Sequence, residues 1–297
     1  MTSQASVFPC KDKYFRSLLC APKMAWPTLG LFLLSVTVLL GASALAIAGS
    51  IPLWLAAIAN GIAMYNLFSV AHDGTHRSLS SNKLVNETLG RIAIMMFMPA
   101  APFEAVRWVH MQHHRFTNSE LDPDRFVHRA KWWQIPFVWT CSDIHYVIYF
   151  LRHGGEQVKK NLRPLLVYSA VFVTLLVALI SLGYGLEVLF LWFIASRIGL
   201  FLIACVFVYL PHYPGDISAQ DDVYKASTIR KGWEGLLNLL LVYQNYHLIH
   251  HLYPTAPFYT YQKIWHLKYD ELVAREPAVQ TAFGLQPVNI PVAASAC

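Results

Sequence analysis

The chain has 297 residues, of which 56% are hydrophobic and only 13% are charged, and its mean hydropathy is +0.40. This composition lies outside the range of ordinary soluble domains and favours a membrane protein. The formal net charge is +6, but the Lys and Arg residues flank apolar stretches and form no dense tract. We therefore expect no nucleic-acid partner, and attraction to anionic lipid headgroups explains the charge better. Five cysteines without a C-x-x-C pair indicate neither a disulfide framework nor a zinc ribbon.

Four apolar stretches are long enough to cross the hydrocarbon layer of a membrane, which takes about 20 helical residues. These stretches are residues 26–48, 51–70, 165–183 and 186–210. Gly49 and Pro52 lie in the link between the first two stretches, and Gly183 and Gly185 lie in the link between the last two, so each pair predicts a tight hairpin. We therefore expect an all-α integral membrane protein, a single domain over residues 1–297, with four transmembrane helices in two hairpins.

The distribution of positive charge predicts the orientation of these helices. The N-terminal arm, residues 1–25, has four Lys and Arg residues, the segment 71–164 has twelve, and the tail 211–297 has six. Neither hairpin tip has any, so the positive-inside rule places both termini and both long segments in the cytoplasm. We read the N-terminal arm as uncleaved. Every histidine then lies in a cytoplasmic cap, and we expect a bacterial inner membrane.

Two other stretches are apolar but do not qualify as spans. Residues 89–103 are too short and contain Arg91, and residues 131–151 are rich in aromatic side chains. Both are predicted to lie in or near the membrane interface. Arg197 lies within the fourth span, where an unpaired charge is costly, but the sequence does not name its partner.

Eight of the thirteen histidines form three compact clusters. The clusters are His72 with His76; His110 with His113 and His114; and His247 with His250 and His251. Residues at positions i, i+3 and i+4 of a helix share one face, so each cluster turns its imidazoles in one direction. By chance, an H-x-x-H-H string would occur about 0.025 times in a chain of this composition. The two copies therefore predict metal coordination.

The number of clustered histidines exceeds the four ligands of a structural zinc site, so two metal ions fit better than one. Imidazole suits zinc, copper, iron and nickel, and the ligand type alone leaves the metal open. His212 follows the fourth span, and its position fits either a ninth ligand or an interfacial hydrogen-bonding residue. The remaining histidines belong to no cluster, and we interpret them as structural: His128, His145, His153 and His266.

Polar residues near the clusters are candidates to orient the imidazoles. Asp73 within the first cluster, and Asp122 and Asp124 after the second, are expected to accept the N–H of a ligand histidine. For Asp122 and Asp124, a turn around Pro123 is an equally good interpretation. Asn245, two residues before His247, is a candidate weak or water-mediated ligand.

At these residues the sequence resembles the membrane fatty acid desaturase superfamily. The three histidine boxes of that superfamily correspond here to H-D-G-T-H at 72–76, H-M-Q-H-H at 110–114 and H-L-I-H-H at 247–251. The order, spacing and placement of the boxes agree over nearly the whole chain. The resemblance implies an oxidoreductase with two non-haem iron ions held by the histidines. It also implies dioxygen as co-substrate, external electrons, and attack on an unactivated C–H bond of a lipid.

Longer strings are most similar to bacterial and cyanobacterial β-carotene hydroxylases. They are H-M-Q-H-H-R-F-T-N from position 110, D-P-D at 122–124, Y-L-P-H-Y at 209–213, and Q-N-Y-H-L-I-H-H-L-Y-P from position 244. This likeness implies that His212 is a ligand and that carotenoid ring hydroxylation is the leading reaction. It also implies a separate electron donor such as a ferredoxin. The cationic stretch from Arg152 to Arg163 is either its docking place or a solvated juxtamembrane face.

Two other functions stay open. A fatty acyl desaturase or hydroxylase would have the same boxes, because the boxes report the metal site and say little about the substrate channel. A non-enzymatic metal transporter or storage protein is the more distant alternative. Transport favours ionisable ligands at mid-membrane depth, whereas these clusters lie outside the spans.

Overall fold

The computed structural model describes residues 13–288, so the start of the N-terminal arm and the end of the tail lie outside the described residues. The described chain is mostly helical, with one two-stranded sheet that the sequence analysis did not include. In chain order, the first helices are α1 (Lys13–Leu19), α2 (Trp26–Ile47), α3 (Leu53–His76), α4 (Lys83–Phe97), α5 (Phe103–Phe116), α6 (Arg125–Arg129), α7 (Ile135–Thr140), α8 (Ser142–His153) and α9 (Glu156–Ser181). A continuous helical stretch follows, made of α10 (Gly185–Glu187), η1 (Val188–Ile194), α11 (Ala195–Ile203), η2 (Ala204–Tyr209) and α12 (Leu210–His212).

The C-terminal segment consists of short elements. They are β1 (Thr228–Lys231), α13 (Glu234–Leu240), η3 (Gln244–Tyr246), α14 (His247–Leu252), η4 (Phe258–Thr260), α15 (Tyr261–Leu267), α16 (Tyr269–Val273) and β2 (Ala278–Thr281). The two strands pair in parallel, with Thr228 opposite Ala278. The guanidinium of Arg230 donates to Gln280 Oε1 at 2.6 Å and to the Gly284 carbonyl oxygen at 2.6 Å. These bonds satisfy a buried charge and fix the chain after β2 to the sheet.

Four helices are long and apolar enough to cross a membrane: α2, α3, α9 and the composite helix Gly185–His212. They match the four predicted stretches, but three of them, α3, α9 and the composite helix, are longer than predicted. Helix α3 continues past residue 70 to His76 and ends where Arg77 adopts a left-handed φ of 58°. Helix α9 starts at Glu156, so its first turns carry charged side chains before the apolar part begins. Helices therefore extend beyond the apolar stretches.

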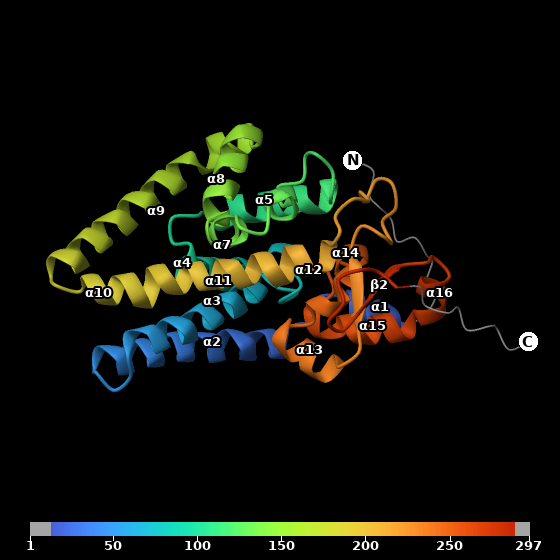
Figure 1. Ribbon diagram of the computed structural model, residues 1–297, viewed down its shortest axis with the longest axis horizontal. Helices are drawn as coiled ribbons and strands as arrows, with labels where there is room; N and C mark the ends of the chain where they lie inside the picture. The colour runs from blue at the N-terminus through green and yellow to red at the C-terminus, as the bar shows by residue number, and fades with distance from the viewer. Residues whose placement is uncertain (1–12, 289–297) are drawn as a thin grey trace, which may run out of the picture.

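Three of the long helices lie side by side, whereas α9 leans away from them (Figure 1). Helix α3 packs against α2 and α11. Gly61 of α3 allows the approach to α11, because a Cβ atom built at Gly61 would lie 2.6 Å from Ile198 Cγ2 and 3.0 Å from the Ala195 carbonyl oxygen. Close backbone approach at small residues is typical of helix pairs in membranes.

The shorter helices α4 to α8 connect α3 to α9 along the chain. Asp143 of α8 pairs with Arg197 of α11 through two hydrogen bonds of 2.9 and 2.6 Å. Arg197 also donates to the Thr140 carbonyl oxygen at 2.9 Å. A bidentate pair of this kind offsets the desolvation of a partly buried charge, which explains how the helix tolerates Arg197.

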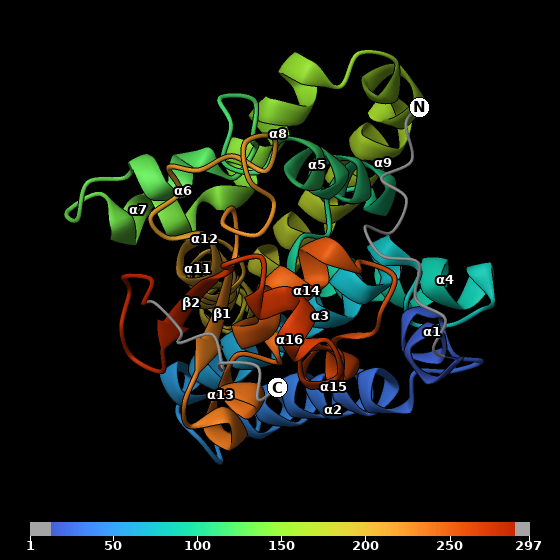
Figure 2. The same ribbon diagram turned by 90° about the vertical axis from the view of Figure 1, so that its right-hand side faces the viewer.

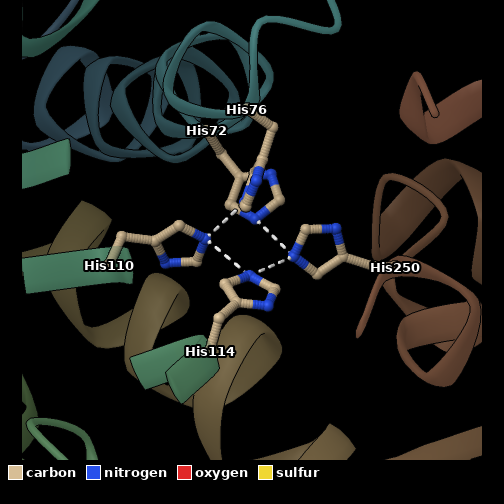
Figure 3. Close-up of side chains that lie close together, drawn as sticks. All are labelled: His72, His76, His110, His114 and His250. Atoms are coloured by element: carbon tan, nitrogen blue, oxygen red, sulfur yellow. Dashed lines mark hydrogen bonds between the residues drawn. The ribbon is translucent and has the colours of Figure 1, made fainter. Parts of the chain in front are cut away.

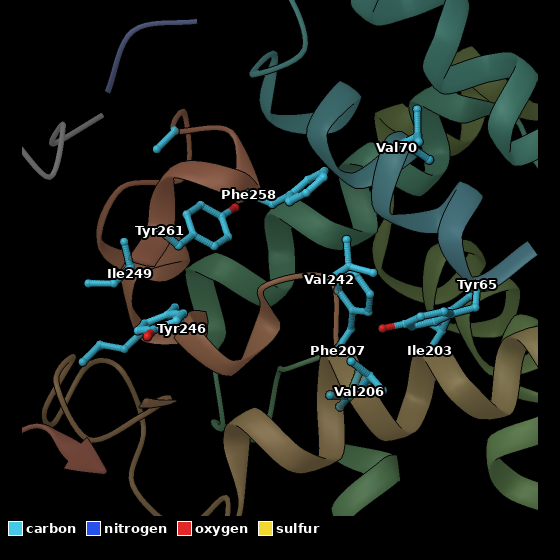
Figure 4. Packing of buried hydrophobic residues seen from close by; sticks show 14 of the residues in the cluster. Tyr65, Val70, Ile203, Val206, Phe207, Val242, Tyr246, Ile249, Phe258 and Tyr261 are labelled. Carbon is cyan, nitrogen blue, oxygen red and sulfur yellow. The ribbon is translucent and has the colours of Figure 1, made fainter. Parts of the chain in front are cut away.

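The C-terminal segment covers one end of the long helices (Figure 2). Its buried side chains pack against α3 and the end of the composite helix in one core (Figure 4). In this core Tyr246 and Ile249 are fully buried, and Phe207 and Tyr65 lie on the long helices. The Tyr65 hydroxyl donates to the Leu240 carbonyl oxygen at 3.0 Å. The same packing fixes α14 next to the ends of α3 and α12.

We expect Gly61→Val to destabilise the protein by about 2 kcal/mol, because the side chain would overpack the contact with α11. Gly41→Val in α2 is the matched control, since a Cβ atom at Gly41 meets nothing within 4 Å. Thermal unfolding of both variants in the same detergent measures the difference. Equal melting temperatures for the two variants would show that the α3–α11 contact does not depend on Gly61.

Candidate metal centre

Four helical elements bring all nine predicted ligand histidines to one region, at the ends of the long helices. Helix α3 supplies two of them from its last two turns, α5 supplies three, α12 supplies one and α14 supplies three. The nitrogens fall into two groups, and within each group the ligand atoms lie within 4.8 Å of one another. The first group is His72, His76, His110, His114 and His250, and the second group is His113, His212, His247 and His251. Each group could hold one metal ion.

In the first group, the imidazoles from α3, α5 and α14 point at a common centre (Figure 3). The Nε2 atom of His110 lies 2.7 Å from that of His76 and 3.1 Å from that of His114. The Nε2 atom of His250 lies 2.9 Å from that of His114 and 3.1 Å from that of His72. The Nε2 atoms therefore form a ring of close neighbours.

The second group is arranged in the same way. The Nε2 atoms of His247 and His251 lie 3.1 Å apart. The ring of His212 lies 4.8 Å from the rings of both His113 and His247, measured between centroids. The Nε2 atom of His212 is buried and has no hydrogen-bond partner. An orphaned acceptor among imidazoles is the arrangement that a bound cation satisfies.

The Nδ1 atoms show why the Nε2 lone pairs face inward. The Nδ1–H of His212 donates to the Ala226 carbonyl oxygen at 2.9 Å, and the Nδ1 atom of His247 lies 2.6 Å from Gln244 Oε1. A neutral imidazole has one N–H, so its use at Nδ1 leaves a lone pair at Nε2. Facing lone pairs repel unless a cation lies between them.

The spacing of the nitrogens fits such a cation. Imidazole nitrogens bind transition metals at about 2.1 Å, so two ligands at right angles lie about 3.0 Å apart. The separations of 2.7 to 3.1 Å in the first group agree with this value. The residues present therefore fit a pair of transition-metal ions.

Burial keeps most of these imidazoles neutral. Outside the long helices, burial and neighbouring imidazoles hold the pKa well below the ordinary value for His110, His114, His247, His250 and His251. Neutral imidazole is the form that binds metal ions. At pH 7 these five imidazoles thus present lone pairs, not positive charges.

His113 differs, because two carboxylates surround it. Its Nδ1 atom lies 2.9 Å from Asp122 Oδ1 and 3.3 Å from Asp124 Oδ2. Burial lowers the pKa of His113, but the two carboxylates outweigh burial and raise that pKa to about 9. Burial also raises the pKa of Asp124 to about 6. A carboxylate on Nδ1 makes Nε2 a more basic metal ligand and fixes the ring.

Asp122 has both roles that the sequence left open. Besides facing His113, its carboxylate accepts the backbone N–H groups of Asn118 at 2.6 Å and Asp124 at 2.9 Å. These bonds stabilise the turn that contains Pro123. One side chain thus fixes the turn and orients the imidazole.

The carboxylate of Asp73 bonds outside the histidine groups, and its expected role of orienting a histidine stays a prediction. Its Oδ2 atom accepts from the Thr28 hydroxyl at 3.0 Å and connects α3 to α2. Asp73 is adjacent to His72 in the helix, so its side chain projects about 100° away from that of His72. Asn245 donates from Nδ2 to Asn238 Oδ1 at 3.0 Å, and its buried Oδ1 atom has no partner. Weak ligation by Asn245 stays a prediction.

Three residues near the histidines were absent from the sequence analysis. Gln244 faces His247 from position i−3, a spacing that the sequence itself contains. Tyr261 lies 3.0 Å from His250 Nδ1 and has no local signal, because it comes from another helix. Tyr146 of α8 lies next to Asp124, and burial together with that carboxylate raises the pKa of Tyr146 well above its ordinary value. His128, His145, His153 and His266 belong to neither group.

An apolar cavity reaches both histidine groups. Its lining includes His110 of the first group and His113 and His247 of the second. The apolar lining comes from several helices and includes Phe68, Phe97, Met98, Ala105, Val106, Val109, Val147, Phe150, Leu165, Leu200, Ile203 and Phe207. A hydrocarbon in this cavity would lie directly beside the metal sites.

The known proteins that are similar to this chain include lipid desaturases and a carotene ketolase. The chain is similar to an sn-1 oleoyl-lipid 12-desaturase of Arthrospira platensis, at 27% identity over 67% of this chain and 63% of that protein. It is 45% identical to a chloroplastic omega-6 fatty acid desaturase of Glycine max over 22% of this chain and 15% of that protein. It is 28% identical to a beta-carotene ketolase of Paracoccus sp. over 65% of this chain and 71% of that protein. The chain thus spans less than two thirds of the length of these desaturases.

The family model described as fatty acid desaturase matches residues 48–282, which contain all three histidine boxes and His212. This match confirms the resemblance read from the boxes. The relatives of this chain named above act on lipids. Four helices of this chain are long and apolar enough to cross a membrane. The chain belongs to the fatty acid desaturase family.

Proposed function

We propose that this protein is a membrane di-iron enzyme that uses dioxygen and external electrons to oxidise an unactivated C–H bond of a lipid. The observation that carries the proposal is the convergence of nine histidines in two groups, with His110, His113 and His247 in the wall of an apolar cavity. A transporter or storage protein has no use for such a cavity beside its metal ions. The relatives, which are desaturases and a ketolase, are oxidoreductases and support the same class.

We assign one iron to each histidine group. Five imidazoles would hold the first iron, and four would hold the second, with Asn245 Oδ1 as an additional weak ligand. When bound, the irons would supply the activation of dioxygen that C–H oxidation needs. The protein's own contribution is to keep the imidazoles neutral, to hold His113 through Asp122 and Asp124, and to exclude water with apolar side chains.

We further propose that the four long helices form two membrane hairpins, with both termini and the histidine groups in the cytoplasm of a bacterial cell. Neither of the two hairpin links has Lys or Arg, which supports this orientation. The electrons would come from a separate donor such as a ferredoxin. Arg152, Lys160 and Arg163 are exposed at the junction of α8 and α9 and offer an acidic donor a cationic surface.

For the substrate, we propose a carotenoid ring, with hydroxylation as the reaction. The strings around His110, His212 and Gln244 support this choice, and a carotene ketolase is matched over 65% of this chain and 71% of its own length. A fatty acyl chain is the second candidate. The lipid desaturases among the relatives favour it.

Purified protein is expected to contain about two irons per chain, and His113→Ala should lose the second iron and abolish turnover, because one of its four imidazoles is removed. His266→Ala is the control, since His266 is exposed and belongs to neither group. Metal analysis and substrate-dependent oxygen uptake measure the two effects. Full activity in an iron-free preparation would disprove the di-iron proposal.

Asp122→Asn is expected to weaken iron retention or activity about 10- to 100-fold, the usual effect of removing a carboxylate behind a ligand histidine. The variant keeps one of the two carboxylate oxygens that accept the backbone N–H groups of Asn118 and Asp124, so the turn should keep one of these two bonds. Asp270→Asn, at an exposed position in α16, is the control. Iron release to a chelator, followed over time, compares the variants, and equal release rates would contradict the role of Asp122.

Expression in cells that make β-carotene is expected to yield hydroxylated carotenoids, because the oxidised carbon would be a ring carbon in the apolar cavity. The same protein in cells without carotenoids should leave the fatty acids unchanged. Pigment and lipid profiling measures both outcomes. New double bonds or hydroxyl groups in fatty acids would instead support the second candidate.

A further inference from the structure

The apolar cavity beside the histidines has an accessible side. His113 in its wall is buried, whereas Leu165 is half-buried and Val147 is exposed. Leu165 lies on α9 and Val147 on α8, and Val106 of α5 lines the cavity as well. The change from buried to exposed lining places the mouth of the cavity between α5, α8 and α9.

Helix α9 is the outer wall of this mouth, and it makes few contacts with the rest of the protein. None of the residues in its most apolar stretch is buried, unlike those of α3 or of the composite helix Gly185–His212. Figure 1 shows α9 close to the composite helix at α10 and diverging from α11 toward α8. In a membrane, both sides of α9 would therefore face lipid chains.

The charges of α9 define the depth of the mouth. Glu156, Lys159, Lys160 and Arg163 lie in its first two turns, and no charged residue follows before the end of the helix. The boundary between headgroups and hydrocarbon therefore lies next to Arg163. Leu165 is two residues further along, so the mouth opens at the outermost level of the hydrocarbon layer.

We propose that this mouth is a lateral entrance through which the hydrocarbon part of a bilayer lipid reaches the metal centre. The proposal rests on the proposed function and adds the source of its substrate. The entering group comes from the leaflet next to the histidines and not from the aqueous side. A substrate linked to a soluble thioester carrier would instead have to enter through water-exposed residues.

Physical chemistry favours this route. A lipid chain or ring that moves from bilayer to cavity exchanges one apolar environment for another and never exposes its surface to water. The lining residues Leu165, Val147 and Val106 are all apolar, so the path contains no charge to desolvate. Apart from the three histidines, the polar side chains in the wall include Asp124 and Tyr146, which lie next to each other and belong to the surroundings of His113.

Leu165→Trp tests the entrance, because the larger side chain would narrow the mouth. Leu166→Trp is the matched control, since Leu166 is 60% exposed, neighbours Leu165 and does not line the cavity. Both variants are reconstituted into phosphatidylcholine vesicles that contain a phosphatidylcholine with a diazirine in its acyl chain. After illumination, mass spectrometry locates the labelled residues.

In the wild type we expect labelling of Val106 and Val109 inside the cavity, and a several-fold loss of this labelling in Leu165→Trp. Leu166→Trp should label the cavity like the wild type, and all three proteins should retain equal iron. Turnover of a membrane-dissolved substrate should fall several-fold in Leu165→Trp alone.

Two results would overturn the entrance. In the first, Leu165→Trp leaves the labelling of cavity residues by the bilayer lipid unchanged. In the second, the cavity residues are labelled by a water-soluble diazirine acyl thioester and not by the bilayer lipid. Labelling does not need iron or turnover, so a labelled but inactive wild type would refute the proposed function and leave the entrance intact.

Discussion

The structure depends on one electrostatic constraint: nine imidazoles are directed at two small volumes. In the first group, neighbouring Nε2 atoms lie 2.7 to 3.1 Å apart. Neutral imidazoles in this arrangement repel each other, and a pair of cations converts that repulsion into binding energy. Since α3, α5, α12 and α14 each contribute ligands, the same cations would hold the C-terminal segment against the long helices.

This convergence requires helices that continue beyond the apolar stretches. His72 and His76 lie in the last two turns of α3, and His212 is the last residue of the composite helix. The long helices therefore act as rigid supports for ligands just outside their apolar parts. The core under α14, with Tyr246 and Ile249, positions the third set of histidines. Rigid positioning of this kind lowers the cost of assembling a metal site.

The sequence allowed prediction of features that depend on neighbours along the chain. Apolar length gave the four long helices, and the i, i+3 and i+4 spacing identified the histidines of each group. Features that depend on contacts between distant segments were out of reach. The pairing of Arg197 with Asp143 and the contact of Tyr261 with His250 join separate helices. The hydrogen bond between Asp73 and Thr28 likewise joins separate helices.

The division between metal site and cavity explains how one family holds desaturases and a ketolase. In the proposed enzyme the histidines, Asp122 and Asp124 would fix where oxidation takes place, while a metal site alone does not select a substrate. Selection must therefore lie in the apolar wall, which decides which carbon of a hydrocarbon comes to rest beside the two histidine groups. In this chain that wall includes Val109, Phe150 and Leu165, from three different helices. Small changes in the spacing of α5, α8 and α9 would move the oxidised carbon while the metal centre stays the same.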